Sequence, residues 1–303
     1  MGPDCGIAEI GAHDVTRIDA HQHYWQLARG DYGWLTRDLK VLYRDYLPED
    51  LKDTLTACSV SGTVLVQAAP TEEETLFLFD LARRHATILG VVGWVDFEAA
   101  DVVQRIDALI ARGGGLLKGL RPMVQDIADP AWLGRASIDG AFRAMAERGL
   151  VFDALVTPLH IEILEWRLLR HPNLACVIDH AGKPVSGDPA LDAWSQRMHR
   201  IATHTQAYCK LSGLFTQFES PVSNDTLTPY VSRLFEYFGP ERLIWGSDWP
   251  VLNLRASYRE WLDTSLALVG SYAPQAAAAI FADNARRVYG LGKPPRGPQR
   301  APS

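Results

Sequence analysis

Residues 17–25, Arg17-Ile18-Asp19-Ala20-His21-Gln22-His23-Tyr24-Trp25, form a short apolar run that ends in two histidines separated by one residue. Residues two apart in a β-strand point to the same side, so this run predicts a strand that presents His21 and His23 together at its end. Two imidazoles at this spacing can converge on one metal ion or on one substrate oxygen. We therefore expect a fold that gathers strand ends into a site.

Seven further runs rich in Val, Ile and Leu follow along the chain, mostly without strict polar alternation. This composition is typical of parallel strands that are covered on both faces. The eight predicted strands are Arg17–His21, Gly62–Ala69, Leu89–Phe97, Leu116–Pro122, Leu150–Val156, Leu174–His180, Ala207–Gly213 and Arg242–Asp248.

Segments with apolar residues at helical spacing lie between these strands, and we predict helices there. The alternation of eight strands with helices predicts a single-domain α/β fold, a closed (β/α)₈ TIM-like barrel. A doubly wound open sheet is the alternative, but it usually has a glycine-rich turn after its first strand, where this chain has His-Gln-His. The predicted helices are Glu72–His85, Ala99–Arg112, Ile138–Arg148, His160–Arg170, Leu191–His204, Leu227–Phe238 and Tyr258–Val269.

The composition limits the possible partners and the domain plan. The chain has 303 residues, 47% hydrophobic residues and a formal net charge of −6, so we expect no nucleic-acid or membrane partner. We predict a barrel domain over residues 17–290, an N-terminal extension over 1–16 and a disordered tail over 291–303. The four cysteines form no close pair, and no leader-like segment opens the chain, which favours a cytoplasmic location.

Polar residues at the other strand ends are candidates for the same site, because the carboxyl ends of barrel strands meet at one face. The sixth predicted strand ends in Asp179 and His180, and we expect His180 to belong to the site with Asp179 orienting a histidine. The eighth ends in Gly-Ser-Asp-Trp-Pro, and Asp248 within it can bind a metal and accept a proton from water.

Four further residues on the strands are weaker candidates, for which a packing role is an equal alternative. They are Gln67, Lys118, Arg121 and Asp153. Arg121 could pair with a substrate carbonyl or hydroxyl groups. The long segment Tyr24–Leu55 contributes aromatic residues, among them Trp25 and Trp34, that could stack on a substrate ring.

The motifs together resemble the amidohydrolase-2 family, and within it the sugar-lactone hydrolase group that includes L-fuconolactonase and L-rhamnonolactonase. The specific part of the match is Asp179-His180-Ala181-Gly182-Lys183-Pro184 and Gly246-Ser247-Asp248-Trp249-Pro250, and the resemblance covers roughly residues 17–290. It implies a distorted barrel that hydrolyses a lactone. His21 and His23 would bind a metal or the carbonyl, His180 would be the sixth-strand histidine, and Asp248 would activate water.

The resemblance also bears on the cofactor. The fifth strand offers Asp153 where binuclear relatives have a histidine, so we expect one divalent ion, Zn²⁺ by preference, or none, with His21, His23 and Asp248 as its ligands. The expected partner is a small sugar lactone, and a homo-oligomer is possible. The alternative functions are metal-dependent decarboxylation of an aromatic or unsaturated acid and ligand binding without catalysis.

Overall fold

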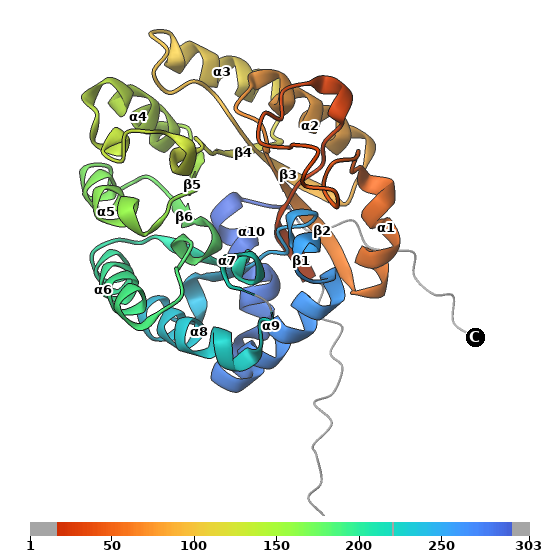
Figure 1. Ribbon diagram of the computed structural model, residues 1–303. Coiled ribbons are helices and arrows are strands. Elements are labelled where there is room, and N and C mark those ends of the chain that lie inside the picture. The colour runs from red at the N-terminus through yellow and green to blue at the C-terminus, as the bar shows by residue number, and fades with distance from the viewer. Residues whose placement is uncertain (1–16, 220, 293–303) are drawn as a thin grey trace, which may run out of the picture.

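The computed structural model describes residues 17–219 and 221–292. Their eight strands form one parallel sheet in which each strand pairs with the next along the chain. Helices surround the sheet on its outer side (Figure 1). The strands are β1 (Arg17–Gln22), β2 (Val60–Val66), β3 (Ile88–Gly93), β4 (Leu117–Leu120), β5 (Val151–Ala154), β6 (Cys176–Ile178), β7 (Tyr208–Leu211) and β8 (Leu243–Trp245).

The sheet closes where the residues after β8 meet β1. The backbone N–H of Asp248 donates to the His21 carbonyl at 2.8 Å, and the N–H of His23 donates to the Trp249 carbonyl at 2.8 Å. The predicted barrel is therefore confirmed, and the open doubly wound sheet is excluded. The closure also brings the His-Gln-His segment beside Asp248.

The predicted helices are all present, with shifted ends. The segment Tyr24–Leu55, expected as a loop, contains the start of a helix at Pro48, and two short helices late in the chain were also not predicted. The helices are α1 (Pro48–Ala57), α2 (Glu72–Arg84), α3 (Val102–Gly113), α4 (Asp139–Glu147), α5 (Ile161–Arg170), α6 (Asp188–His204), α7 (Leu214–Gln217), α8 (Asn224–Phe238), α9 (Tyr258–Tyr272) and α10 (Asn284–Tyr289).

Two apolar layers hold the barrel together. Outside it, helices bury one face against the strands, as α3 does with Val102, Ile106 and Leu109. A second cluster of strand residues includes α10, whose Tyr289 packs against it. That cluster contains Ile18, Val64, Val92, Val151, Val177 and Ile244.

Several predictions fall partly or wholly outside the described residues. The extension over 1–16 lies outside them, as do residues 293–303 of the tail. Cys58, Cys176 and Cys209 are buried and free, whereas Cys5 lies outside the described part. Within that part, none of the helices is both long and apolar enough to cross a membrane.

Candidate functional site

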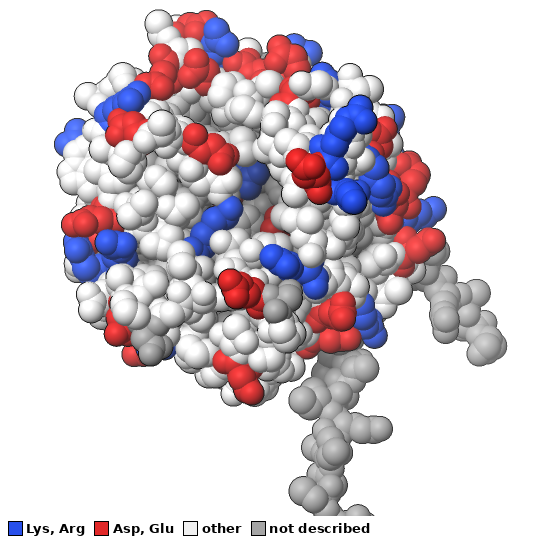
Figure 2. All heavy atoms as spheres, viewed as in Figure 1, with Lys and Arg blue, Asp and Glu red and all other residues white. Residues whose placement is uncertain are grey.

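The carboxyl ends of the strands surround a cavity of about 200 Å³. The face of the molecule in Figure 2 is hollowed at its centre, and basic side chains lie inside the hollow. Among the charged residues that line the cavity are Arg121 and Lys183, together with Asp126 and Asp248. The cavity therefore joins fixed positive charge to two carboxylates in a small volume.

Asp19 fastens β1 to the segment that follows β8. Its Oδ1 accepts the N–H of Ser247 at 2.8 Å and the N–H of His21 at 3.2 Å. The Tyr258 hydroxyl donates to its Oδ2 at 3.0 Å. Asp19 is fully buried, so its role is to fix the two strand ends and not to contact a substrate.

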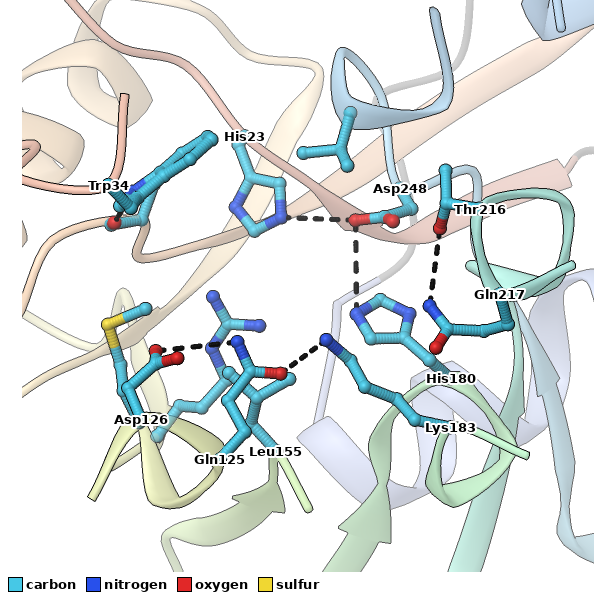
Figure 3. Close-up of a pocket in the computed structure, with 14 residues that line it drawn as sticks. His23, Trp34, Gln125, Asp126, Leu155, His180, Lys183, Thr216, Gln217 and Asp248 are labelled. Carbon is cyan, nitrogen blue, oxygen red and sulfur yellow. Dashed lines mark hydrogen bonds and ion pairs between the residues drawn. The ribbon is translucent and has the colours of Figure 1, made fainter. Parts of the chain in front are cut away.

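Asp248 lies at the centre of the site, facing three imidazoles. Its Oδ1 is 3.4 Å from His23 Nε2, 3.8 Å from His21 Nε2 and 3.9 Å from His180 Nε2. Figure 3 shows Asp248 between His23 and His180 at one end of the cavity. The structure thus brings together all four residues that the sequence placed in the catalytic centre.

The protonation states at this centre follow from burial and from charge. Burial alone would raise the pKa of Asp248, but the positive charge that His180 and His21 carry when they are protonated at low pH holds it well below its usual value. Burial lowers the pKa of His180 to about 4, and burial together with the Lys210 charge lowers that of His21. Near neutral pH the site therefore holds an ionised Asp248 with His21 and His180 neutral.

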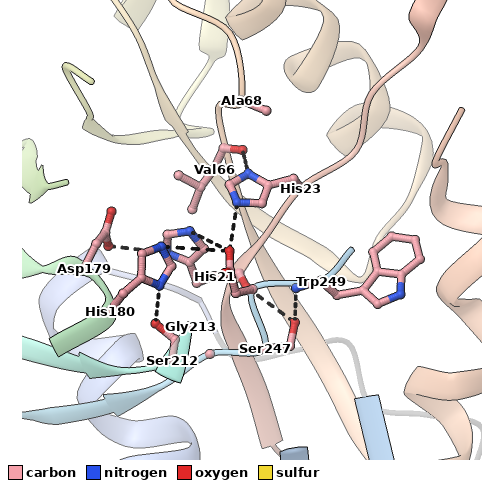
Figure 4. Close-up of polar contacts among 12 residues, drawn as sticks. His21, His23, Val66, Ala68, Asp179, His180, Ser212, Gly213, Ser247 and Trp249 are labelled. Carbon is pink, nitrogen blue, oxygen red and sulfur yellow. Dashed lines mark hydrogen bonds and ion pairs between the residues drawn. The ribbon is translucent and has the colours of Figure 1, made fainter. Parts of the chain in front are cut away.

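His180 is held in a strained backbone conformation. Its φ is +51°, and Ala181 and Lys183 also have positive φ, a region that costs non-glycine residues free energy. The Ser212 hydroxyl lies 2.9 Å from His180 Nδ1, as Figure 4 shows. A Cβ on Gly213 would lie 2.5 Å from the same nitrogen, so a glycine is required there. This geometry turns Nε2 of His180 toward Asp248.

A charged network lies beneath these residues. Lys210 is fully buried, with Nζ 2.5 Å from Asp153 Oδ2, 3.0 Å from Asp179 Oδ1 and 3.1 Å from His21 Nδ1. Arg121 Nη1 lies 3.4 Å from Asp179 Oδ2 and 3.4 Å from His21 Nε2. His21 is therefore flanked by a cationic group at each ring nitrogen.

The donor atoms at the centre fit a divalent metal. The Nδ1–H of His23 donates a hydrogen bond to the Val66 carbonyl at 2.7 Å. Nε2 of the neutral ring therefore carries no proton, and it faces a carboxylate oxygen of Asp248. Two facing acceptors are stabilised by a cation between them, and ligands about 2.1 Å from one tetrahedral Zn²⁺ lie roughly 3.4 Å apart. Two groups of described residues have metal-binding geometry, His21/His23/Asp248 and His21/Asp179/His180.

Among the weaker candidates, Arg121 lines the cavity and Gln67 does not. Gln67 is fully buried, and its side-chain amide donates to the Arg121 carbonyl at 2.8 Å. The Arg121 guanidinium donates in turn to the backbone and side-chain oxygens of Gln67. Gln67 thus orients Arg121, and the expectation that it reads substrate hydroxyls does not fit its position.

Three further substrate-binding expectations do not fit the structure. Trp25 is fully buried, with its indole N–H bonded to the Arg44 carbonyl, and Trp34 lines the cavity instead. Lys118 lies two residues before the carboxyl end of β4, does not line the cavity, and donates to the Gly290 carbonyl. Asp153 is fully buried and paired with Lys210. Strand residues distant from the carboxyl end, or covered by packing, cannot reach the cavity.

Sequence reasoning missed several residues that line the cavity. Lys183, within the Asp-His-Ala-Gly-Lys-Pro motif, lines it, and its ammonium donates to Gln125 Oε1. Gln125 and Asp126 come from the turn after β4, where a polar pair following Arg121-Pro122 was the available signal. Thr216 and Gln217 come from the short helix α7, which was not predicted.

Comparisons with known proteins agree with this geometry. The chain matches the family described as Amidohydrolase over residues 18–291. It is 41% identical over 282 residues to an L-fucono-1,5-lactonase of Burkholderia ambifaria, covering 92% of this chain and 97% of that protein. An L-fucono-1,5-lactonase of Burkholderia multivorans is 34% identical over 300 residues, with the same two coverages. A crystal structure of an amidohydrolase from B. multivorans with bound Zn has a TM-score of 0.85 at 33% identity, covering 91% of this chain and 100% of that one.

Proposed function

Since the chain belongs to the amidohydrolase family, as its motifs predicted, we propose that it hydrolyses the ring ester of a sugar-derived aldono-1,5-lactone. The relatives named L-fucono-1,5-lactonase support this substrate class. The observation that carries the proposal is the ionised Asp248, which lines the cavity with three imidazoles around it. This arrangement can take a proton from water beside an electrophilic carbonyl.

Asp248 acts first as a general base. It accepts a proton from a water molecule while the water oxygen bonds to the lactone carbonyl carbon. When the tetrahedral species collapses, the bond from that carbon to the ring oxygen breaks, and Asp248 returns the proton to the ring oxygen. The products are a hydroxyl group and a carboxylic acid, which ionises and releases one proton to solvent.

The negative charge that develops on the carbonyl oxygen needs a fixed positive partner. His21 and His180 are neutral, because burial lowers the pKa of both. Protonated forms of these two imidazoles are therefore poor candidates for this role. Arg121 and Lys183 line the same cavity and carry the charge required. Trp34 would cover the apolar face of the sugar ring.

We also propose that one divalent ion, Zn²⁺ by preference, can bind at His21, His23 and Asp248. When bound, such an ion would polarise the carbonyl and lower the pKa of water. The group of His21, Asp179 and His180 would not hold a second ion, because the Asp179 carboxylate is already paired with Lys210 and Arg121. Metal analysis of the purified protein should find at most one ion per chain.

A substrate screen tests the proposed function. Proton release would be measured, with and without chelator, across a panel of aldono-1,5-lactones and aldono-1,4-lactones after subtraction of spontaneous hydrolysis. We expect turnover of at least one aldono-1,5-lactone that the Asp248→Asn variant lacks. Release of CO₂ from hydroxybenzoates in place of lactone hydrolysis would favour the alternative, a metal-dependent decarboxylase. Tight lactone binding without turnover would favour a binding protein.

Two further expectations from the sequence remain predictions. A cytoplasmic location rests on the sparse, unpaired cysteines. A homo-oligomeric state would be measured by sedimentation.

A further inference from the structure

A second cavity, of about 520 Å³, adjoins the catalytic cavity. Its volume lies within the roughly 300–1,000 Å³ typical of small-molecule sites. Its lining combines carboxylates with aromatic rings, and none of the described residues that line it is a Lys or Arg. Asp31, Asp96 and Glu98 supply carboxylates, and Trp94, Phe97 and Trp132 supply rings. The chemistry described so far uses none of these six residues.

The two cavities share part of their walls. Trp34, Met123 and Asp126 line both of them. In Figure 3, Trp34 and Asp126 lie at the end of the catalytic cavity away from Asp248 and His180. Trp34 is fixed there because its indole N–H donates to the Ala68 carbonyl at 2.7 Å. These shared residues therefore form the boundary between the two cavities.

The lining is suited to a hydroxylated ring. Aromatic faces stack on the apolar C–H face of a sugar, and carboxylate oxygens accept hydrogen bonds from its hydroxyl groups. Asp96 is exposed and forms no ion pair among the described residues, so its carboxylate remains available as an acceptor. Asp31 and Glu98 are already paired with Arg29 and Arg135. The catalytic cavity, at about 200 Å³, is the smaller of the two. A second ring would require the neighbouring volume.

We propose that the second cavity binds a glycosyl substituent carried by the lactone, so that the enzyme accepts 4-O-glycosylated aldono-1,5-lactones. This inference rests on the proposed function. In a 1,5-lactone ring, C4 lies across the ring from the carbonyl carbon. With the carbonyl near Asp248, a substituent on O4 points toward Trp34 and Asp126 and into the second cavity.

The test compares a disaccharide lactone with the matching monosaccharide lactone, cellobiono-1,5-lactone with glucono-1,5-lactone. We expect kcat/KM for the disaccharide to be at least about tenfold higher. The Trp94→Ala variant should lower kcat/KM for the disaccharide about tenfold, which is the size expected for the loss of one aromatic contact. Its kcat/KM for the monosaccharide should not change. The conservative Asp96→Asn variant should also lower kcat/KM for the disaccharide, by a smaller factor, and should leave the fold intact.

Trp166→Ala is the matched control, because Trp166 is an exposed tryptophan on α5 and lines neither of the two cavities. The kcat/KM of this variant should equal that of the wild type for both lactones. Turnover of the monosaccharide with no gain for the disaccharide would overturn the inference and leave the proposed function standing. If the wild-type protein turned over no lactone at all, both the proposed function and this inference would be overturned. Binding of tetramethylammonium by the second cavity, with no gain for the disaccharide, would identify an organic-cation site instead.

Discussion

The centre that faces the cavity and the network beneath it use the same residue types in opposite ways. Asp248 and Asp153 are both buried carboxylates on strand-derived segments. Asp248 faces imidazoles and lines a cavity, whereas Asp153 contacts Lys210 and the Tyr289 hydroxyl, at 2.9 Å from the latter. Of these two carboxylates, only Asp248 faces the cavity, as its proposed role as a base requires.

The same contrast applies to the cations. Arg121 and Lys183 line the cavity, while Lys210 is fully enclosed between Asp153 and Asp179. Burial by itself would lower the pKa of Lys210, but the charges of these two carboxylates raise it, so the ammonium persists. We expect substitutions at the cavity to reduce turnover and substitutions beneath it to reduce stability.

The largest effect should come from Asp248→Asn. The substitution keeps the side-chain shape and suits the φ of +60° at this position, because asparagine tolerates the left-handed region. Loss of the base should lower kcat by roughly 10²–10⁴-fold. The unfolding temperature should fall, because an ionised carboxylate whose pKa is held below its usual value stabilises the folded state and asparagine cannot replace it. Near-normal turnover of every lactone would contradict the role of Asp248.

Lys210→Met should act mainly on stability. It leaves Asp153 and Asp179 without their shared ammonium, and an uncompensated buried charge costs about 3–5 kcal/mol. Chemical denaturation measures the loss. Lys118→Met is the matched control, because Lys118 has one carbonyl contact and should cost less than about 1 kcal/mol. If the two variants lost the same free energy of unfolding, the buried network around Lys210 would contribute no special stability.

Glu74 extends the comparison to a buried carboxylate bonded to backbone N–H groups. It accepts from Ala68 and Ala69 at 2.7–3.0 Å, and burial raises its pKa from 4.5 to about 8. The stability contributed by its protonated form is fully present below about pH 4.5 and is lost as the pH rises through about 8.

The Glu74→Gln variant removes this titration. Its free energy of unfolding relative to the wild type should increase by up to about 4 kcal/mol between pH 4 and pH 8.5, since one pKa unit corresponds to about 1.4 kcal/mol. Urea denaturation across this range measures the difference. A difference that does not vary with pH would show that Glu74 has the same pKa in the folded and unfolded states, which would contradict the raised pKa.

The smallest effect should come from Ser212→Ala. The variant removes the hydroxyl that lies 2.9 Å from His180 Nδ1 and leaves the backbone in place. One such hydrogen bond contributes about 0.5–1.5 kcal/mol, so kcat should fall no more than about tenfold. Steady-state kinetics measure this, with Ser271→Ala on the exposed part of α9 as the control. A loss as large as that of Asp248→Asn would give Ser212 a direct role in the chemistry.

Much of the fold could be predicted from sequence, because each strand is an apolar run and each predicted helix has an apolar stripe. The helix starting at Pro48 was missed because it lies in a segment dominated by aromatic and charged residues. Sequence also predicted the segment around His180 as strand, whereas β6 ends at Ile178 and a left-handed turn follows. Local patterns do not report where a chain leaves its sheet.

The proposed catalytic centre could be predicted because its residues lie at the end of a strand or within three residues after it. They are His21, His23, His180 and Asp248. The substrate-binding residues could not, because reaching the cavity depends on side-chain direction and on loop packing. Trp25 and Trp34 illustrate this, since they come from one segment and only Trp34 lines the cavity. Gln67 does lie at the predicted strand end. Its side chain is hydrogen-bonded to Arg121, however, and so does not face the cavity.

In the proposed reaction, water activated by Asp248 attacks the lactone carbonyl directly. A single turnover in H₂¹⁸O, with enzyme in excess over lactone, tests this by mass spectrometry of the product and of the peptide that contains Asp248. We expect one ¹⁸O in the new carboxylate of the product and none in Asp248. Label in the Asp248 side chain would show that this residue attacks the carbonyl itself, and label in the product hydroxyl would show that the wrong ring bond breaks; either result would contradict the account.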